Sequence, residues 1–131
     1  MTDRELIRIA IEARKAAYTP YSHFQVGAAL LAADGTVYTG CNVENAAYTP
    51  TNCAERTAFF KAVSEGERQF TAIAVVGGKG GNIDGLFPPC GVCRQVMAEF
   101  CDGSFTVISG NPNGEIHRYT LDELLSNRFS L

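Results

Sequence analysis

Two short cysteine-bearing segments constrain the fold of this chain more than any other feature. Cys53-Ala54-Glu55 places a thiol and a carboxyl group two residues apart, and Cys90-Gly91-Val92-Cys93 places two thiols three residues apart. Each segment lies at the beginning of a run that is typical of a helix, and side chains three apart share one helix face. Three thiols and one carboxylate meet at one point if the beginnings of these two helices converge. The chain is therefore expected to fold so that they do.

Local signals predict where the two helices begin and end. Asn52 is a favourable N-cap residue, and Glu55 three positions later completes a capping box. Gly66 is a plausible end for this first helix. The second helix is expected over residues 90–100. Its buried apolar stripe is predicted to consist of Val92, Val96, Met97 and Phe100.

The remaining segments predict an α/β domain that spans residues 1–131. Thr2 and Glu5 form a capping box at the start of an N-terminal helix, and Thr120 and Glu123 form one at the start of a short final helix. Asp34-Gly35 is a strong hairpin signal between two strands. Strands are expected at residues 24–31, 36–43, 71–76, 105–109 and 116–119, with a glycine-rich surface connection over residues 77–89. Because strands and helices alternate, the fold class predicted is a three-layer α/β/α domain with a mixed five-stranded sheet.

Composition narrows the classes of function. A net charge of -3 lacks the basic excess of a nucleic-acid-binding surface, so no nucleic-acid partner is expected. No apolar run reaches the length of a membrane span, and the N-terminus lacks the layout of a signal peptide, so no membrane partner is expected either. Five cysteines, an odd number, suit a reducing cytoplasm better than a disulfide framework.

Cys53, Cys90 and Cys93 are the candidate metal ligands, and zinc is the ion that three thiolates fit best. Catalytic zinc typically has three protein ligands and a water, whereas structural zinc has four protein ligands. Two other cysteines do not fit the site, because Cys41 should face away from it and Cys101 lies too far along the second helix. A closed four-cysteine structural site and a redox dithiol formed by Cys90 and Cys93 remain the alternatives.

Two residues beside Cys53 are expected to support catalysis at such a site. Glu55 is the candidate catalytic acid and base, exchanging protons between water and substrate. Three thiolates give the site a negative charge that has to be offset, and we hypothesise that Arg56 does so by donating hydrogen bonds to the cysteine sulfurs. The alternative for Arg56 is an exposed side chain that pairs with a distant carboxylate.

The two half-motifs form a ligand-x-Glu unit followed by Pro-Cys-x-x-Cys, the known signature of zinc-dependent deaminases. The whole chain also resembles the small homotetrameric cytidine deaminases of pyrimidine salvage. Four blocks in order carry this resemblance: Tyr21-Ser22-His23-Phe24-Gln25-Val26-Gly27-Ala28-Ala29, Cys41-Asn42-Val43-Glu44-Asn45-Ala46-Ala47-Tyr48, Thr51-Asn52-Cys53-Ala54-Glu55-Arg56-Thr57-Ala58 and Pro89-Cys90-Gly91-Val92-Cys93-Arg94-Gln95.

The resemblance implies roles for further residues. Asn42 and Glu44 would bind the ribose hydroxyls, Phe24 would pack against the pyrimidine, and the backbone of Ala54 would meet the base. As a homotetramer, the protein would share its pockets between subunits. The neighbouring subunits would contribute Ala46, Tyr48 and Phe129.

The function that the resemblance implies is hydrolytic deamination of cytidine and 2′-deoxycytidine to the uridines, with one zinc ion per subunit. A free nucleoside requires no base flipping, which agrees with the acidic charge of the chain. The nearest alternatives are deamination of another cytosine nucleoside, such as a blasticidin-type antibiotic, and editing of cytosine in RNA. A zinc-stabilised interaction module without catalysis and a dithiol oxidoreductase are alternatives from other classes.

Overall fold

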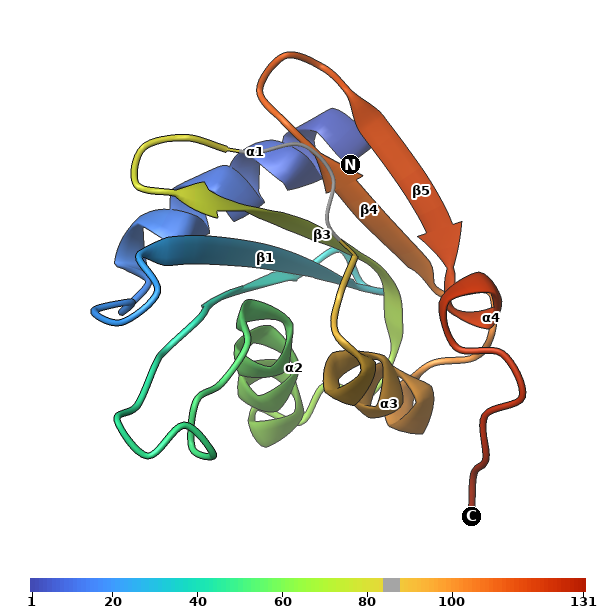
Figure 1. Ribbon diagram of the computed structural model, residues 1–131. Coiled ribbons are helices and arrows are strands. Elements are labelled where there is room, and N and C mark those ends of the chain that lie inside the picture. The colour runs from blue at the N-terminus through green and yellow to red at the C-terminus, as the bar shows by residue number, and fades with distance from the viewer. Residues whose placement is uncertain (84–87) are drawn as a thin grey trace.

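The computed structural model describes residues 1–83 and 88–131 and contains a mixed five-stranded sheet (Figure 1). The strand order is β2-β1-β3-β4-β5. The strands are β1 (Phe24–Ala32), β2 (Val37–Cys41), β3 (Phe70–Lys79), β4 (Thr106–Gly110) and β5 (Ile116–Thr120). Of the neighbouring pairs, β3 and β4 are parallel and the other three are antiparallel. The prediction of a mixed five-stranded sheet is confirmed.

The helices lie on both faces of this sheet, as the three-layer prediction requires (Figure 1). They are α1 (Asp3–Ala13), which a 3-10 turn η1 (Arg14–Ala16) extends, α2 (Ala54–Ser64), α3 (Gly91–Phe100) and α4 (Leu121–Leu124). α1 covers one face, whereas α2 and α3 cover the other. In the described part of the chain, no helix combines the length and the apolar character that crossing a membrane requires.

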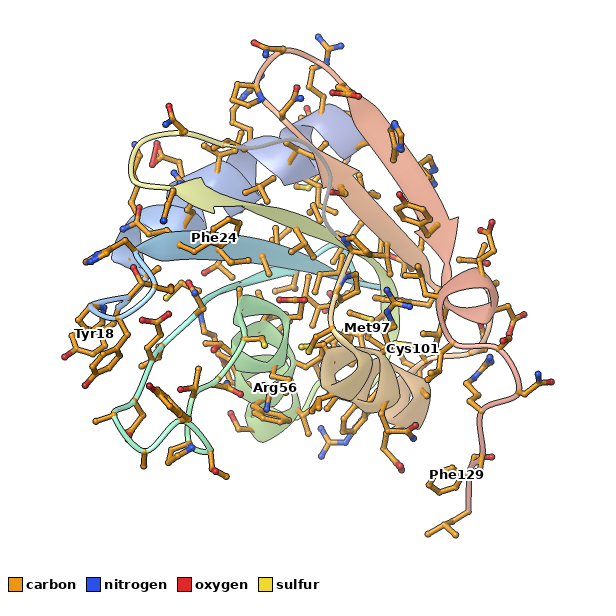
Figure 2. The ribbon with its side chains drawn as sticks, in the orientation of Figure 1. Tyr18, Phe24, Arg56, Met97, Cys101 and Phe129 are labelled. Atoms are coloured by element: carbon orange, nitrogen blue, oxygen red, sulfur yellow. The ribbon has the colours of Figure 1, made fainter. Side chains whose placement is uncertain are left out.

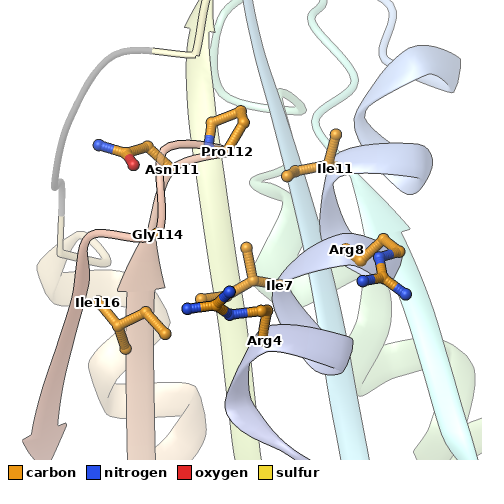
Figure 3. A pocket seen from close by; sticks show the side chains of 8 residues that line it. All are labelled: Arg4, Ile7, Arg8, Ile11, Asn111, Pro112, Gly114 and Ile116. Carbon is orange, nitrogen blue, oxygen red and sulfur yellow. The ribbon is translucent and has the colours of Figure 1, made fainter.

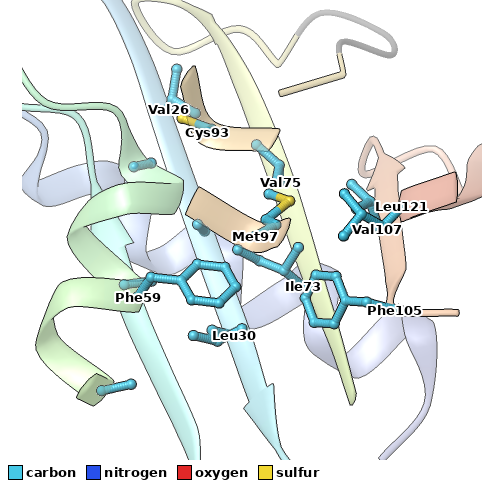
Figure 4. Packing of buried hydrophobic residues seen from close by; sticks show 14 residues of the cluster. Val26, Leu30, Phe59, Ile73, Val75, Cys93, Met97, Phe105, Val107 and Leu121 are labelled. Atoms are coloured by element: carbon cyan, nitrogen blue, oxygen red, sulfur yellow. The ribbon is translucent and has the colours of Figure 1, made fainter. Parts of the chain in front are cut away.

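Alternating strand residues build two separate cores, one on each face. Leu30 and Val75 belong to the larger cluster beneath α2 and α3, whereas Ala29 and Ala74 belong to the smaller cluster beneath α1. Figure 4 shows the larger cluster, in which Phe59 of α2 and Met97 of α3 meet side chains of the central strands. This period-two division is the direct consequence of strand geometry.

Of the four helix ends predicted from capping signals, three are confirmed and one is wrong. The capping boxes at Thr2 and Thr120 are present, and Gly66 follows α2 with a φ of 97°. The prediction that Asn52 caps α2 is wrong, because Cys53 is the N-cap residue. Asn52 is instead held in an extended conformation by backbone hydrogen bonds with Val43, and its side-chain amide donates to the Thr57 hydroxyl.

Two further expectations are corrected by the packing. Val92 is 58% exposed rather than buried, because Cys93 and Met97, four residues apart, form the face of α3 that points at the core. The strand β3 also continues to Lys79, so Gly77 and Gly78 pair with β1 and do not belong to a surface loop. Residues 84–87 of the expected connection lie outside the described part of the chain.

The first turn of α2 packs directly on the backbone of β2 at Gly40. A Cβ atom at Gly40 would lie 2.3 Å from the carbonyl oxygen of Ala54 and 2.6 Å from the backbone nitrogen of Ala58. Both distances are far below van der Waals contact. Only glycine therefore allows this turn of α2, which carries Cys53 and Glu55, to sit as close to the sheet.

We expect Gly40→Ala to lower the free energy of unfolding by about 1–3 kcal/mol, because the helix backbone has to move away from the strand. Chemical denaturation followed by circular dichroism measures this change. Gly81→Ala is the matched control, because a Cβ there meets no atom within 4 Å, and it should change stability by less than about 0.5 kcal/mol. Equal unfolding midpoints for the two variants would contradict the prediction.

Candidate active site

The three cysteines of the predicted metal site converge at the beginnings of two helices. Cys53 is the N-cap residue of α2 and Cys90 is the N-cap residue of α3, and neither helix start has a side-chain capping bond. The Sγ atoms of Cys53 and Cys90 lie 3.8 Å apart, and those of Cys90 and Cys93 lie 3.4 Å apart. Within the described residues, these three form the only group of metal-ligating side chains close enough to hold one ion, so Cys41 and Cys101 do not belong to it.

The spacing of the sulfurs fits a zinc ion. With Zn–S bonds of about 2.3 Å, neighbouring sulfurs in a tetrahedral site lie about 3.8 Å apart. A disulfide would require sulfurs about 2.05 Å apart, and all five cysteines are free thiols. Cys53, Cys90 and Cys93 would therefore hold the ion, and three protein ligands are the number typical of catalytic rather than structural zinc.

The local electrostatics favour negative charge on one of the three sulfurs, that of Cys53. A hydrogen bond from Cys93, together with hydrogen bonding and charge from Arg56, lowers the pKa of Cys53. The same interaction with Cys53, together with burial, raises the pKa of Cys93. The sulfurs of Cys53 and Cys93 thus compete for one proton. A bound cation would remove this competition, since metal binding deprotonates thiol ligands.

Arg56 lies one turn after Cys53 on α2, where Figure 2 labels it. Its Nη2 donates a hydrogen bond to Cys53 Sγ over 3.3 Å. Its Nε is buried and has no hydrogen-bond partner among the described residues. The guanidinium is consequently directed at the cysteine cluster and not at a distant surface carboxylate.

Glu55 lies beside the cluster with its carboxyl group buried. Only 4% of the residue is exposed, and this burial raises the pKa of Glu55 to about 7. The charge of Cys53 acts in the same direction, whereas hydrogen bonding to the Glu55 backbone opposes it. Because the helix is capped at Cys53, the Glu55 side chain is not used in a capping box and points into the adjacent cavity. A carboxyl group with such a pKa is suited to both accepting and releasing protons near neutral pH.

An inner cavity adjoins this cluster, and an outer cavity shares Thr51 with it. The inner cavity has a volume of about 220 Å³ and the outer one of about 290 Å³. The inner cavity is lined by Val26, Asn42, Thr51, Asn52, Cys53, Ala54, Glu55, Pro88 and Cys90. The outer cavity is lined by Tyr21, Ser22, Glu44, Asn45, Tyr48 and Thr51. The structure thus brings Ala54 and Asn42 to the cavity beside the metal cluster and places Glu44 in the neighbouring outer cavity.

Asn42 and Glu44 are both held in place by hydrogen bonds within the chain. Asn42 accepts from the Val26 backbone at 2.9 Å and donates to the Phe24 carbonyl at 2.9 Å. Glu44 accepts from the backbone nitrogens of Tyr21 and Ser22 at 3.0 and 3.1 Å, and from the Ser22 hydroxyl. The Ser22 hydrogen bond lowers the pKa of Glu44, so this carboxylate stays ionised. Each side chain retains unused acceptor or donor capacity for a ligand.

Of the four other predicted site residues, Tyr48 lines the outer cavity, whereas the other three line neither cavity. Phe24 is partly buried and packs against the larger core cluster. Ala46 is exposed in the loop before α2. Tyr48, at the outer cavity, is 77% exposed with a positive φ of 62°, and Phe129 is 70% exposed on the C-terminal tail. Figure 2 shows that this tail extends away from the part of the sheet that carries Phe24.

Sequence reasoning assigned no role to two residues that the structure places at the site. Ser22 binds Glu44, and Thr51 lines both cavities and accepts from the Asn45 backbone nitrogen. Both lie inside the blocks that carry the family resemblance, which was the available signal. Their partners could not be identified from sequence because loop geometry determines them.

A larger cavity of about 330 Å³ lies on the opposite face of the sheet, between α1 and the β4–β5 turn (Figure 3). It is lined by Arg4, Ile7, Arg8, Ile11, Asn111, Pro112, Gly114 and Ile116. These eight residues include no thiol, imidazole or carboxylate. Cavity size alone would thus misplace the site, whereas the chemistry of the lining residues locates it at the cysteine cluster.

Comparisons with known proteins agree with this assignment. A family model described as "Cytidine and deoxycytidylate deaminase zinc-binding region" matches residues 1–109. The cytidine deaminase of Sporosarcina psychrophila is 56% identical over 130 residues, which cover 99% of this chain and 93% of that protein. A crystal structure of cytidine deaminase from Burkholderia pseudomallei has a TM-score of 0.91 and 48% identity, covering 98% of this chain and 100% of that chain.

A more distant relative is the blasticidin-S deaminase of Bacillus cereus, which is 30% identical over 132 residues, covering 98% of this chain and 92% of that protein. The likeness to these proteins extends over nearly the full length and includes both halves of the cysteine cluster. The resemblance predicted from the sequence is confirmed. The chain belongs to the cytidine and deoxycytidylate deaminase family.

Proposed function

We propose that this protein is a zinc-dependent enzyme that deaminates cytidine and 2′-deoxycytidine by hydrolysis, as a step of pyrimidine salvage. The observation that carries the proposal is the buried Glu55 carboxyl group next to three convergent cysteine sulfurs at the end of a small cavity. Full-length similarity to proteins named cytidine deaminase supports the same substrate class.

Cys53, Cys90 and Cys93 would hold the zinc ion. When bound, zinc would supply a nucleophile by lowering the pKa of a water molecule toward neutrality. In the net reaction the oxygen of water replaces the 4-amino group of cytosine, and ammonia is released. Glu55 would take a proton from the attacking water, pass it to ring N3, and later deliver a proton to the departing amino group.

The two cavities suggest how a nucleoside would be oriented. The base would occupy the inner cavity, where the backbone of Ala54 lies beside Glu55, and Phe24 would support it from the sheet. The ribose would extend toward the outer cavity, with Asn42 and Glu44 as the groups that bind its hydroxyls. Such a pocket suits a small neutral substrate, in keeping with the net charge of -3.

We further propose that the active form is a homotetramer whose subunits share their pockets. Ala46, Tyr48 and Phe129 would complete the site of a neighbouring subunit. Their exposure in the single chain supports this proposal, since an aromatic side chain that is 70–77% exposed has little to pack against within its own subunit. The left-handed backbone of Tyr48 supports it as well, because such strain is concentrated at functional sites.

Deamination of a blasticidin-type nucleoside is the second candidate, and the 30% identity to a blasticidin-S deaminase favours it over unrelated chemistry. The ionised Glu44 next to Thr51 in the outer cavity favours a substrate with free ribose hydroxyls, such as cytidine. Competition between cytidine and blasticidin S in one assay would distinguish the two substrates.

The zinc-loaded protein should convert cytidine to uridine, measured as loss of cytidine absorbance and release of ammonia. Glu55→Gln should lower kcat by about 10²- to 10⁴-fold, because the amide keeps the shape of the side chain but cannot carry the proton. The zinc content of Glu55→Gln should equal that of the unaltered protein. Full loading with zinc and no turnover of cytidine by the unaltered protein would refute the proposed function.

Arg56→Ala should weaken zinc retention by about 10- to 100-fold, because a group that binds a metal ligand helps to hold it. Competition with a chromogenic chelator measures the affinity. Arg8→Ala, at an exposed position of α1 on the opposite face, is the control and should keep zinc. Unchanged zinc affinity and turnover in Arg56→Ala would show that the hydrogen bond from Arg56 to Cys53 contributes neither to zinc binding nor to catalysis.

Glu44→Gln should lower kcat/KM for cytidine by about 10- to 100-fold, the loss expected for a hydrogen bond to a charged group. The same variant should change kcat/KM for 2′,3′-dideoxycytidine less than about threefold, because this nucleoside lacks both hydroxyls. If both substrates lose activity equally, Glu44 acts only by holding Tyr21 and Ser22 in place.

A further inference from the structure

Arg14 is a buried arginine that lies on the face of the sheet opposite the cysteine cluster. It belongs to η1, the turn that follows α1, and is only 5% exposed. Its backbone is pressed against β1, because a Cβ atom at Gly27 would lie 2.6 Å from the Arg14 nitrogen. Burial of a guanidinium is costly unless its donors are used, so its contacts indicate what it does.

Among residues 1–83 and 88–131, the Arg14 side chain binds four backbone carbonyls from two segments. Nε donates to Gln25 at 2.9 Å, near the start of β1. Nη2 donates to three carbonyls of the segment that ends β3 and follows it, those of Gly78 at 2.7 Å, Gly80 at 2.7 Å and Asn82 at 2.6 Å. Nη2 has only two hydrogens, so at least one of them is shared. The planar fork of arginine thus joins the start of β1 to residues 78–82, which an ammonium group could not do in the same way.

The segment that Arg14 holds is also the one that supports the inner cavity. Gln25 lies between Phe24, whose carbonyl accepts from Asn42, and Val26, whose nitrogen donates to Asn42. Val26 and Asn42 line the inner cavity. The backbone nitrogen of Gly80 in turn donates to the carbonyl of His23 at 3.2 Å, next to Phe24. Figure 1 shows that β1 begins, β3 ends and α1 finishes at the same end of the sheet, and Figure 2 labels Phe24 there.

We propose that Arg14 is a positioning residue for substrate binding: by joining the start of β1 to residues 78–82, it fixes Phe24, Val26 and Asn42 in the geometry that receives the nucleoside. The proposal rests on the proposed function of the inner cavity. The hydrogen bonds that join Arg14 to Gln25, Gly78, Gly80 and Asn82 involve no residue that lines the inner cavity and no cysteine, so we expect an effect on substrate affinity and not on zinc binding or proton transfer.

The test compares Arg14→Lys and Arg14→Met with the control variants Arg8→Lys and Arg8→Met, at an exposed position of the preceding helix. Both Arg14 variants should raise KM for cytidine about tenfold, with kcat changed less than about threefold, since a displaced pocket wall weakens ground-state and transition-state binding alike. Their zinc content should stay at the level of the unaltered protein. The Arg8 variants should match the unaltered protein in all three measurements.

Hydrogen exchange provides a second readout that does not depend on enzymatic activity. In Arg14→Lys, the amides of Val26 and Gly80 should exchange about tenfold faster, because their bonds lie in the segments that Arg14 joins. The amide of Leu125, bonded to Leu121 in α4, should be unchanged. If the unaltered protein does not turn over cytidine, the proposed function fails, while this measurement still decides whether Arg14 holds the two segments.

Three kinds of result would overturn the proposal. The first is an unchanged KM with unchanged exchange at Val26 and Gly80. The second is a loss of zinc or a selective fall in kcat, which would place the effect of Arg14 at the metal site. The third is an equal acceleration of exchange at Leu125, or failure of both Arg14 variants to fold, since Arg14 would then stabilise the whole domain without a specific effect on the cavity.

Discussion

The convergence of two helix beginnings on one point is the interaction on which the rest of this structure depends. α2 and α3 each begin at a cysteine that occupies the N-cap position without a side-chain capping bond. The backbone N–H groups of the first turn and the positive end of the helix dipole favour negative charge at such a position, and the pKa of Cys53 is lowered. Because α2 begins at Cys53, Glu55 and Arg56 lie in its first turn. Glu55 reaches the inner cavity, and Arg56 reaches the sulfur of Cys53.

Features encoded by local sequence were predictable, because they need no knowledge of the tertiary structure. The hairpin signal at Asp34-Gly35, the capping boxes at Thr2 and Thr120 and the spacing of Cys90 and Cys93 are of this kind. The errors came from tertiary contacts. Asn52 has the chemistry of an N-cap, but backbone pairing with Val43 holds it one residue outside the helix.

The apolar stripe of α3 illustrates a second limit of sequence patterns. Val92 and Cys93 are adjacent and both apolar, so periodicity alone does not determine which of them faces the core. The rotation of the helix is set by the need to place Cys93 beside Cys53, which leaves Val92 at the surface. The partners of Arg14 were equally inaccessible, because they follow from the register that places Gln25 opposite Gly78.

Close backbone packing on both faces of the sheet explains why Arg14, on the face that α1 covers, can influence the inner cavity on the opposite face. Gly27 lies against the end of α1 and Gly40 against the start of α2, and the two glycines sit in adjacent strands near the same end of the sheet. Because neither position carries a side chain that could absorb a shift, a displacement of β1 is transmitted to the backbone of the neighbouring element. The residues that shape the inner cavity thus depend on the sheet beneath them, so that substrate binding and packing of the domain are coupled at this end of the fold.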